Sequence, residues 1–96
     1  MIISFGDKAT EDLYHGRSTA RARRFPRDLV RVALRKLDML NAAPELLDLR
    51  SPPGNRLEAL DGQLRGFHRV RVNDQWRVVF RWSGCDAHDV RLTDYH

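Results

Sequence analysis

Cysteine is almost absent from this sequence of 96 residues, and its single cysteine, Cys85, can form neither a disulfide framework nor a cysteine-based zinc site. No apolar run approaches the ~20 residues that cross a bilayer. The first residues also lack the basic start and the long apolar stretch of a secretion signal. Linkers, repeats and low-complexity segments are missing too. We therefore expect one domain over residues 1–96, located in the cytoplasm and without membrane contact.

Lysine is scarce, whereas arginine is abundant. The chain has 17 basic residues against 13 acidic ones, which gives a net charge of +4, and only two of the basic residues are lysine. Arginine binds phosphate through a planar fork and stacks on bases, while lysine acts as a point charge. This composition favours nucleic acid or an acidic protein as partner, although the base composition of a genome also enriches arginine.

The segment Phe67–Trp82 alternates between apolar and basic residues, as a half-buried strand does. Polar turn residues at 73–75 divide it into two strands. The pattern predicts an antiparallel hairpin with an apolar face formed by Val70, Val72, Trp76, Val78, Phe80 and Trp82, and a basic face formed by Arg69, Arg71, Arg77 and Arg81. Like charges gathered on a sheet are destabilising, so this face either binds an anion or is an ordinary solvated surface.

The remainder of the chain predicts two helices and three further strands. A short strand is expected at residues 1–5, and Asp7 is expected to cap a helix from Lys8 that ends at Gly16. The basic connector 17–24 is expected to be either a mobile loop or an exposed first turn. Pro26 suits the first turn of a second helix, which stops before Pro44. The leucines of segment 44–50 are expected to be buried, and strands are expected at 57–60 and around Val90.

This order of elements predicts an α+β domain. An N-terminal strand and two helices would pack on one face of a mostly antiparallel sheet. The opposite face of the sheet would then be left for function.

Three separated segments resemble the HigB-like toxins of the RelE/ParE superfamily of type II toxin–antitoxin systems. They are Asp48–Leu60 (DLRSPPGNRLEAL), Arg71–Phe80 (RVNDQWRVVF) and Asp94–His96 (DYH). The motifs follow one another in the family's order, and the resemblance covers the whole chain. It implies a RelE/ParE-like α+β fold.

The resemblance also implies an activity and its partners. Toxins of this kind, the plasmid maintenance killer type, are ribosome-dependent endoribonucleases (mRNA interferases) that cut messenger RNA, inhibit translation and work without a metal or another cofactor. A HigA-type antitoxin with a helix-turn-helix domain holds them inactive. The implied partners are therefore the ribosome, messenger RNA and this antitoxin, and operator DNA would be bound only through the antitoxin.

RNA cleavage by its own 2′-hydroxyl needs a base, an acid and cations that stabilise the phosphorane. Arg71 and Arg77, on one face of the predicted hairpin, suit the cationic clamp, and the terminal imidazole suits proton transfer because its reference pKa is near neutral. The resemblance therefore implies a catalytic set of Arg71, Arg77, Asp94, Tyr95 and His96, and further RNA-binding arginines at Arg56, Arg69 and Arg81. From the residues alone, a polar chain end is the favoured interpretation of the terminal tripeptide, and either clamp arginine can instead pair with Asp74 or Asp94.

The chain departs from the family pattern at two places. Relatives usually carry a lysine and an arginine in the turn where this chain has residues 61–64 (DGQL), and some carry a catalytic histidine where Glu58 stands. Two other functions remain open at this point. One is a non-nucleolytic toxin that binds a protein target such as DNA gyrase, and the other is an RNA-binding module without catalysis.

Overall fold

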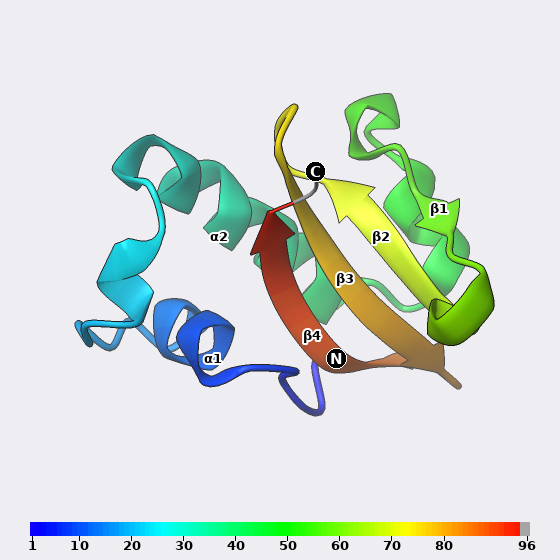
Figure 1. Cartoon of the computed structure of the whole chain (residues 1–96). Coiled ribbons are helices and arrows are strands. Elements are labelled where there is room, and N and C mark those ends of the chain that lie inside the picture. The colour runs from blue at the N-terminus through cyan, green and yellow to red at the C-terminus, as the bar shows by residue number, and fades with distance from the viewer. Residues whose placement is uncertain (95–96) are drawn as a thin grey trace.

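A four-stranded antiparallel sheet forms one side of the molecule, and two helices form the other (Figure 1). The computed structural model describes residues 1–94. The helices are α1 (Lys8–Tyr14) and α2 (Arg27–Ala42), and the strands β1 (Glu58–Ala59), β2 (Phe67–Arg71), β3 (Trp76–Ser83) and β4 (Asp86–Asp94) lie in sequence order across the sheet. Short 3-10 turns join them: η1 (Ala22–Arg24), η2 (Leu46–Arg50), η3 (Pro53–Asn55) and η4 (Gly62–Leu64). The predicted α+β fold class is confirmed.

Local sequence signals account for the helix boundaries. The side chain of Asp7 accepts a hydrogen bond from the amide of Thr10 at 2.8 Å, which caps the start of α1. Gly16 follows α1 with φ of +72°, a left-handed conformation that glycine adopts without strain. Helix α2 begins directly after Pro26 and ends at Ala42, two residues before Pro44.

One hydrophobic core lies between α2 and the inner face of the sheet. The buried side chains of α2 recur at three- and four-residue steps, which places them on one face of the helix. They pack against alternate residues of the strands, because alternate side chains share a face of the sheet. The fully buried members of this core include Leu29, Ala33, Leu37 and Leu40 from α2, and Val70, Val78, Phe80 and Val90 from the strands.

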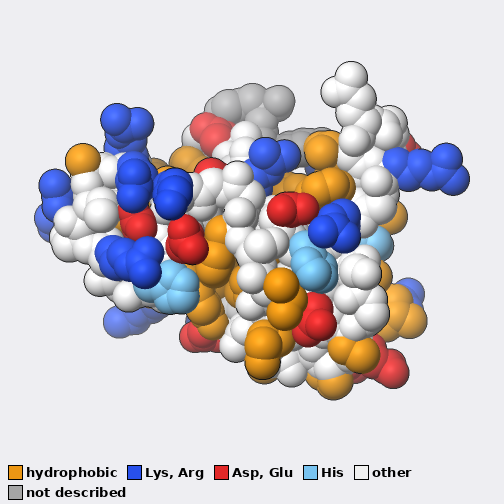
Figure 2. Space-filling model, turned by 90° about the horizontal axis from the view of Figure 1, so that it is seen from below, with side chains coloured by type: hydrophobic (Ala, Val, Ile, Leu, Met, Phe, Trp, Pro, Cys, Tyr) orange, Lys and Arg blue, Asp and Glu red, His pale blue; other side chains and the backbone are white. Residues whose placement is uncertain are grey.

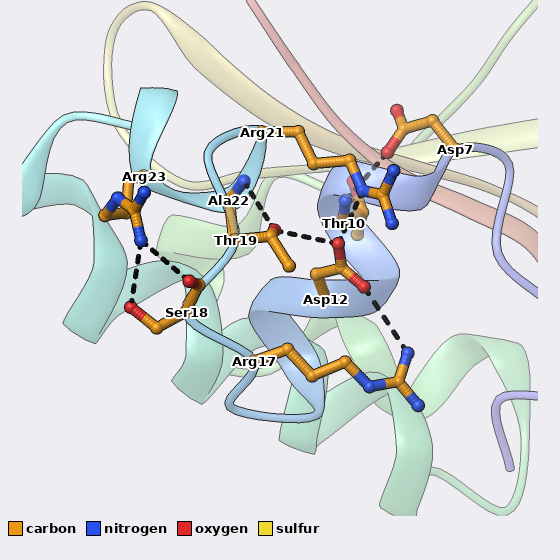
Figure 3. A network of polar contacts seen from close by, with 9 residues as sticks. All are labelled: Asp7, Thr10, Asp12, Arg17, Ser18, Thr19, Arg21, Ala22 and Arg23. Atoms are coloured by element: carbon orange, nitrogen blue, oxygen red, sulfur yellow. Dashed lines mark hydrogen bonds and ion pairs between the residues drawn. The ribbon is translucent and has the colours of Figure 1, made fainter.

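The basic connector between the helices folds around a buried carboxylate (Figure 3). The side chain of Asp12, only 2% exposed, accepts hydrogen bonds from Arg21 Nε at 2.5 Å, Thr19 Oγ1 at 2.8 Å and Arg17 at 3.4 Å. Arg23 in turn donates to the carbonyl of Ser18 at 2.7 Å. The connector is therefore a folded segment that contains η1, and Figure 2 shows Lys and Arg side chains gathered at this end of the molecule.

The first residues pair with β4 but form no continuous strand. Two isolated parallel bridges join Ile2 to Ala87 and Phe5 to Val90, where a strand over residues 1–5 was expected. Gly6 lies so close to β4 that a Cβ atom there would stand 2.8 Å from the carbonyl oxygen of Asp89. The segment thus covers the outer edge of β4, and only its glycine permits this approach.

Two other expectations differ from the structure. The prediction that the leucines of segment 44–50 are buried is right for Leu49 and wrong for Leu47, whose side chain is 62% exposed. Segment 46–50 is a 3-10 turn that directs Leu47 away from the core. Strand β1 is also shorter than expected, because only Glu58 and Ala59 pair with β2. Within residues 1–94, no helix has both the length and the apolar character that a membrane crossing requires.

Candidate functional site

The β2–β3 hairpin aligns two arginines directly across from each other. Arg71 pairs with Arg77, and two residues along the strands Arg69 pairs with Val79. Paired residues share a face of the sheet, and neighbouring strands lie about 4.8 Å apart. The alternate positions Val70 and Val78 are in the core, so the arginines lie on the face opposite α2. The alternation predicted this shared face, and the structure adds the register that pairs Arg71 with Arg77.

Each of these arginines contacts a polar group nearby. Arg69 pairs with Glu58 on β1 at 2.8 Å, and Arg71 pairs with Asp74 in the hairpin turn. The guanidinium of Arg77 donates to the backbone carbonyl of Asn73 and, at 3.0 Å, to that of Trp76. The two acids are exposed, at 52% for Glu58 and 99% for Asp74. Their arginine partners are more covered, at 16% for Arg69 and 27% for Arg71, so each pair is open to solvent on the side of its acid, where another anion can compete for the guanidinium.

The positive charges of these arginines repel one another. Burial is the main cause that lowers the pKa of Arg77, and the neighbouring cations Arg71, Arg69 and Arg56 lower it further, while Glu58 opposes them. Arg77 therefore lies within reach of the charges of three other arginines. We call Arg56, Arg69, Arg71 and Arg77 the arginine cluster.

Arg56 reaches the cluster from a segment that is anchored in the core. The preceding Asn55 is 1% exposed, donates to the carbonyls of Leu49 at 3.1 Å and Ser51 at 3.3 Å, and accepts from Lys36 of α2. Burial, and then the charges of neighbouring arginines including Arg71, lower the pKa of Lys36. Arg56 follows Asn55 in the left-handed region, with φ of +46°. The hydrogen bonds of the Asn55 side chain fix the backbone at this point, and the position of Arg56 depends on them.

Asp94 ends β4 on the strand next to Arg77. It is the register partner of Trp76, and its carboxylate accepts a hydrogen bond from Gln75 Nε2 at 2.9 Å. Tyr95 and His96, the other two members of the expected terminal tripeptide, lie outside the described residues. Their proposed roles therefore stay predictions.

Arg81, also expected to bind RNA, lies apart from the arginine cluster. It pairs with Phe67 and His88 near the far end of β3 and forms an ion pair with Asp89 at 3.4 Å. It lies four positions after Arg77, which corresponds to about 13 Å along a strand. Arg81 therefore extends the basic surface and does not contribute to the cluster.

A hollow beside the arginine cluster was not foreseen. It encloses about 380 Å³ and is lined by Leu60, Asp61, Leu64, Val79, Arg91, Thr93 and Asp94. We call it the sheet hollow. The sequence analysis identified Asp61 and Leu64 only as departures from the family pattern. It did not identify Arg91 and Thr93 of β4 as site residues. The signal that would have found them is the cross-strand register, because Val79 pairs with Arg91 and Arg77 with Thr93.

The arrangement is suited to binding a phosphodiester. Arginine forks make charge-assisted hydrogen bonds with phosphate oxygens, and a phosphate on the cluster would relieve the repulsion among its cations. Among residues 1–94, no three histidine, cysteine or acidic side chains are grouped so that they could hold a metal ion. Asp94 ends the neighbouring strand, but its register partner is Trp76, so the register places it on the opposite face of the sheet from Arg77, and Thr93 is the neighbour of Arg77 on the outer face.

Comparisons of the sequence with known proteins point to one family. The family model described as "RelE-like toxin of type II toxin-antitoxin system HigB" matches residues 3–96. Toxin HigB-1 of Vibrio cholerae serotype O1 is 43% identical over 82 residues, which are 85% of this chain and 84% of that protein. An uncharacterized protein of Haemophilus influenzae is 36% identical over 69 residues, 72% of this chain and 68% of that protein.

Solved structures share the fold at low sequence identity. The YoeB–YefM complex from Staphylococcus aureus contains a chain with a TM-score of 0.62 and 14% identity, covering 100% of this chain and 98% of that one. YafQ from Escherichia coli gives a TM-score of 0.56 at 12% identity, covering 98% and 93%. These likenesses concern the fold alone.

Proposed function

Because the chain belongs to the HigB-like family of RelE-like toxins from type II toxin–antitoxin systems, we propose that it is an endoribonuclease that cleaves messenger RNA on the ribosome. The observation that carries this proposal is the arginine cluster. Four cations held around one point of a sheet suit a reaction whose transition state gains negative charge on phosphorus-bound oxygens. Such a toxin would act where translation takes place, in the bacterial cytoplasm.

The proposed reaction is a transesterification within the RNA. A base removes the proton of the 2′-hydroxyl, the 2′-oxygen attacks phosphorus, and the bond from phosphorus to the 5′-oxygen breaks as an acid protonates that oxygen. The products are a 2′,3′-cyclic phosphate and a free 5′-hydroxyl. Arg71 and Arg77 would stabilise the phosphorane, and the terminal residues Asp94, Tyr95 and His96 would carry the two proton transfers.

The remaining arginines would hold the RNA strand in place. Arg56 and Arg69 would contact the phosphates next to the scissile one, since both act on the same point as Arg77. Arg81, about 13 Å further along β3, would meet a more distant phosphate. RNA phosphates would displace Glu58 and Asp74 from their arginines, because exposed ion pairs hold their partners weakly.

We also propose that a HigA-type antitoxin neutralises this chain at the helices. A hollow of about 480 Å³ lies there, and the residues that line it include the apolar Leu13, Phe25 and Val30 and the basic Arg17, Arg23 and Arg27. An amphipathic segment with acidic residues complements both features. The same basic end of the molecule would otherwise contact ribosomal RNA, so a bound antitoxin would keep the toxin off the ribosome.

The nuclease proposal is tested by the variant Arg77→Ala in a translation reaction with a defined messenger RNA. We expect wild type to create new RNA 5′ ends and the variant to cleave about 100- to 1000-fold more slowly, as expected for the loss of one transition-state contact. Primer extension measures the ends. The matched control is Arg31→Ala, an exposed arginine of α2 on the other side of the sheet, which should cleave at the wild-type rate.

Circular dichroism and thermal unfolding check that both variants remain folded. A folded Arg77→Ala variant with undiminished cleavage would contradict the role of the cluster. DNA breaks without new RNA ends would instead identify a gyrase-directed toxin.

A further inference from the structure

The sheet hollow continues directly from the arginine cluster across the strands. In one row, Arg71, Arg77 and Thr93 are neighbours on β2, β3 and β4, and in the next row Arg69, Val79 and Arg91 are neighbours. Rows on one face lie about 7 Å apart, two residues along the strand. Val79, which lines the sheet hollow, therefore lies one row from Arg77. This offset is comparable to the reach from a phosphate to the base of the same nucleotide.

The arginine cluster and the sheet hollow differ in charge, so they suit different parts of a nucleotide. The cluster consists of four arginines, whereas the residues that line the hollow include two acids, Asp61 and Asp94, and one arginine, Arg91. Carboxylates repel a phosphate, so the backbone of an RNA strand belongs on the cluster. The apolar side chains of Leu60, Leu64 and Val79 suit a flat, uncharged base instead.

We propose that the sheet hollow is a nucleobase subsite that takes a guanine of the RNA strand held on the arginine cluster, and that Asp61 reads its Watson–Crick edge. This inference rests on the nuclease function proposed above. Unpaired RNA bases are recognised through such edges once they are splayed out of the strand. Within residues 1–94, the carboxylate of Asp61 takes part in no ion pair, while its side chain is exposed at the hollow.

The preference for guanine follows from the donors on each base. A carboxylate has only acceptors, and guanine alone presents two adjacent N–H donors, N1–H and the N2 amino group, on its Watson–Crick edge. Adenine and cytosine present one donor beside an acceptor, and uracil presents one donor between two acceptors. Arg91 is among the residues that line the hollow, and a guanidinium plane is a group on which a base can stack.

Binding of mononucleotides tests the subsite without any cleavage. The full chain, with labelled methyl groups, is titrated with the 5′-monophosphates of guanosine, adenosine, cytidine and uridine. We expect the guanosine nucleotide to bind about tenfold more tightly than the others and to shift the methyl signals of Leu60, Leu64 and Val79. In Asp61→Asn this preference should be lost in favour of adenosine and cytidine, because an amide offers one donor and one acceptor. The control Asp28→Asn, an exposed acid of α2, should keep the guanosine preference.

Cleavage mapping on a mixed-sequence messenger RNA provides the second measurement. Wild type should cut mainly where guanine occupies one fixed position relative to the cut, and Asp61→Asn should lose that enrichment about tenfold while still cutting RNA. Equal binding of the four nucleotides, or a guanosine preference that survives Asp61→Asn, would overturn the subsite and leave the nuclease proposal intact. If wild type makes no RNA ends but binds guanosine through Asp61, the nuclease proposal fails and the subsite stands.

Discussion

Asp12 is the residue on which the basic connector depends. Its carboxylate is buried in α1 and accepts hydrogen bonds from Arg17, Thr19 and Arg21, all of which follow it in the chain (Figure 3). A buried charge without partners would be strongly unfavourable, so α1 and the connector stabilise each other. The hydrogen bond from Arg21, followed by that from Thr19, lowers the pKa of Asp12 below its ordinary value of 3.8, although burial opposes the shift.

This shift predicts how the variant Asp12→Asn responds to pH. Because the folded pKa lies below the unfolded one, the carboxylate contributes stability above pH ~4, and this contribution is lost as the pH falls through the folded pKa. We expect the variant to unfold at a lower urea concentration than wild type at pH 7, with a smaller difference at pH 3. The control Glu11→Gln, the neighbouring acid, should show little difference at either pH. If the difference between the variant and wild type were the same at both pH values, the lowered pKa assigned to Asp12 would be contradicted.

Sequence patterns foresaw the arginines of the site and one ion pair, that of Arg71 with Asp74, but not the other partners. Alternation in the hairpin predicted that Arg69, Arg71 and Arg77 share a face, because strand geometry leaves only two faces. The burial of Asp12 was not foreseen, since it needs donors that the fold brings back from the connector. The pairing of Glu58 with Arg69 was missed for a similar reason, because it depends on the register between β1 and β2.

At the scale of elements, the outer edge of β4 is covered by the start of the chain and by α1. The amides of Ala87 and Val90 donate to the carbonyls of Met1 and Ser4, and the amide of Leu92 donates to the hydroxyl of Thr10 at 2.9 Å. An open edge invites pairing with other chains, so this cover keeps the sheet at four strands on that side.

The variant Thr10→Val tests this cover. Valine keeps the shape of threonine but cannot accept the hydrogen bond of Leu92, and the side chain is fully buried. The unsatisfied amide should lower the free energy of unfolding by about 2 kcal/mol. Urea unfolding measures the change, and Ser83→Ala, at the exposed end of β3, is the control that should cost little. A loss equal to that of the control would mean that water replaces the hydroxyl.

Elements with strong local signals were predicted closely, and those without them were not. The helices have a cap, a proline or a glycine at their ends, and their spacing of apolar residues defines the buried face. The first five residues carry no such signal, and their pairing with β4 joins positions about 85 residues apart. A pairing of that kind is decided by the tertiary fold.

At the scale of the whole molecule, the net charge of +4 and the arginine cluster make RNA binding sensitive to salt. If the four cluster arginines each neutralise one phosphate, log K for a short single strand should fall against log[salt] with a slope of about −3. Replacing Arg56 with glutamine should reduce that slope by about 0.7, whereas Arg31→Ala should leave it unchanged. Filter binding at several salt concentrations measures both, and an identical slope for the Arg56 variant would place that residue off the RNA.

The sequence motifs foresaw the family of the whole chain, and the family model confirms it. They did not foresee the sheet hollow, which three separate segments build together: residues 60–64, β3 and β4. The residues that line the hollow could be identified only from the register of β3 against β4.

The two ends of β4 have a practical consequence for handling the protein. The amino group of Met1 pairs with Asp86 at the start of this strand, at 3.4 Å, whereas Asp94 closes it on the order of 25 Å away, beside the cluster. An affinity tag fused before Met1 would thus emerge far from the RNA. A tag fused after His96 would begin only two residues beyond Asp94, the last residue of β4, so purification for any assay calls for the amino-terminal fusion.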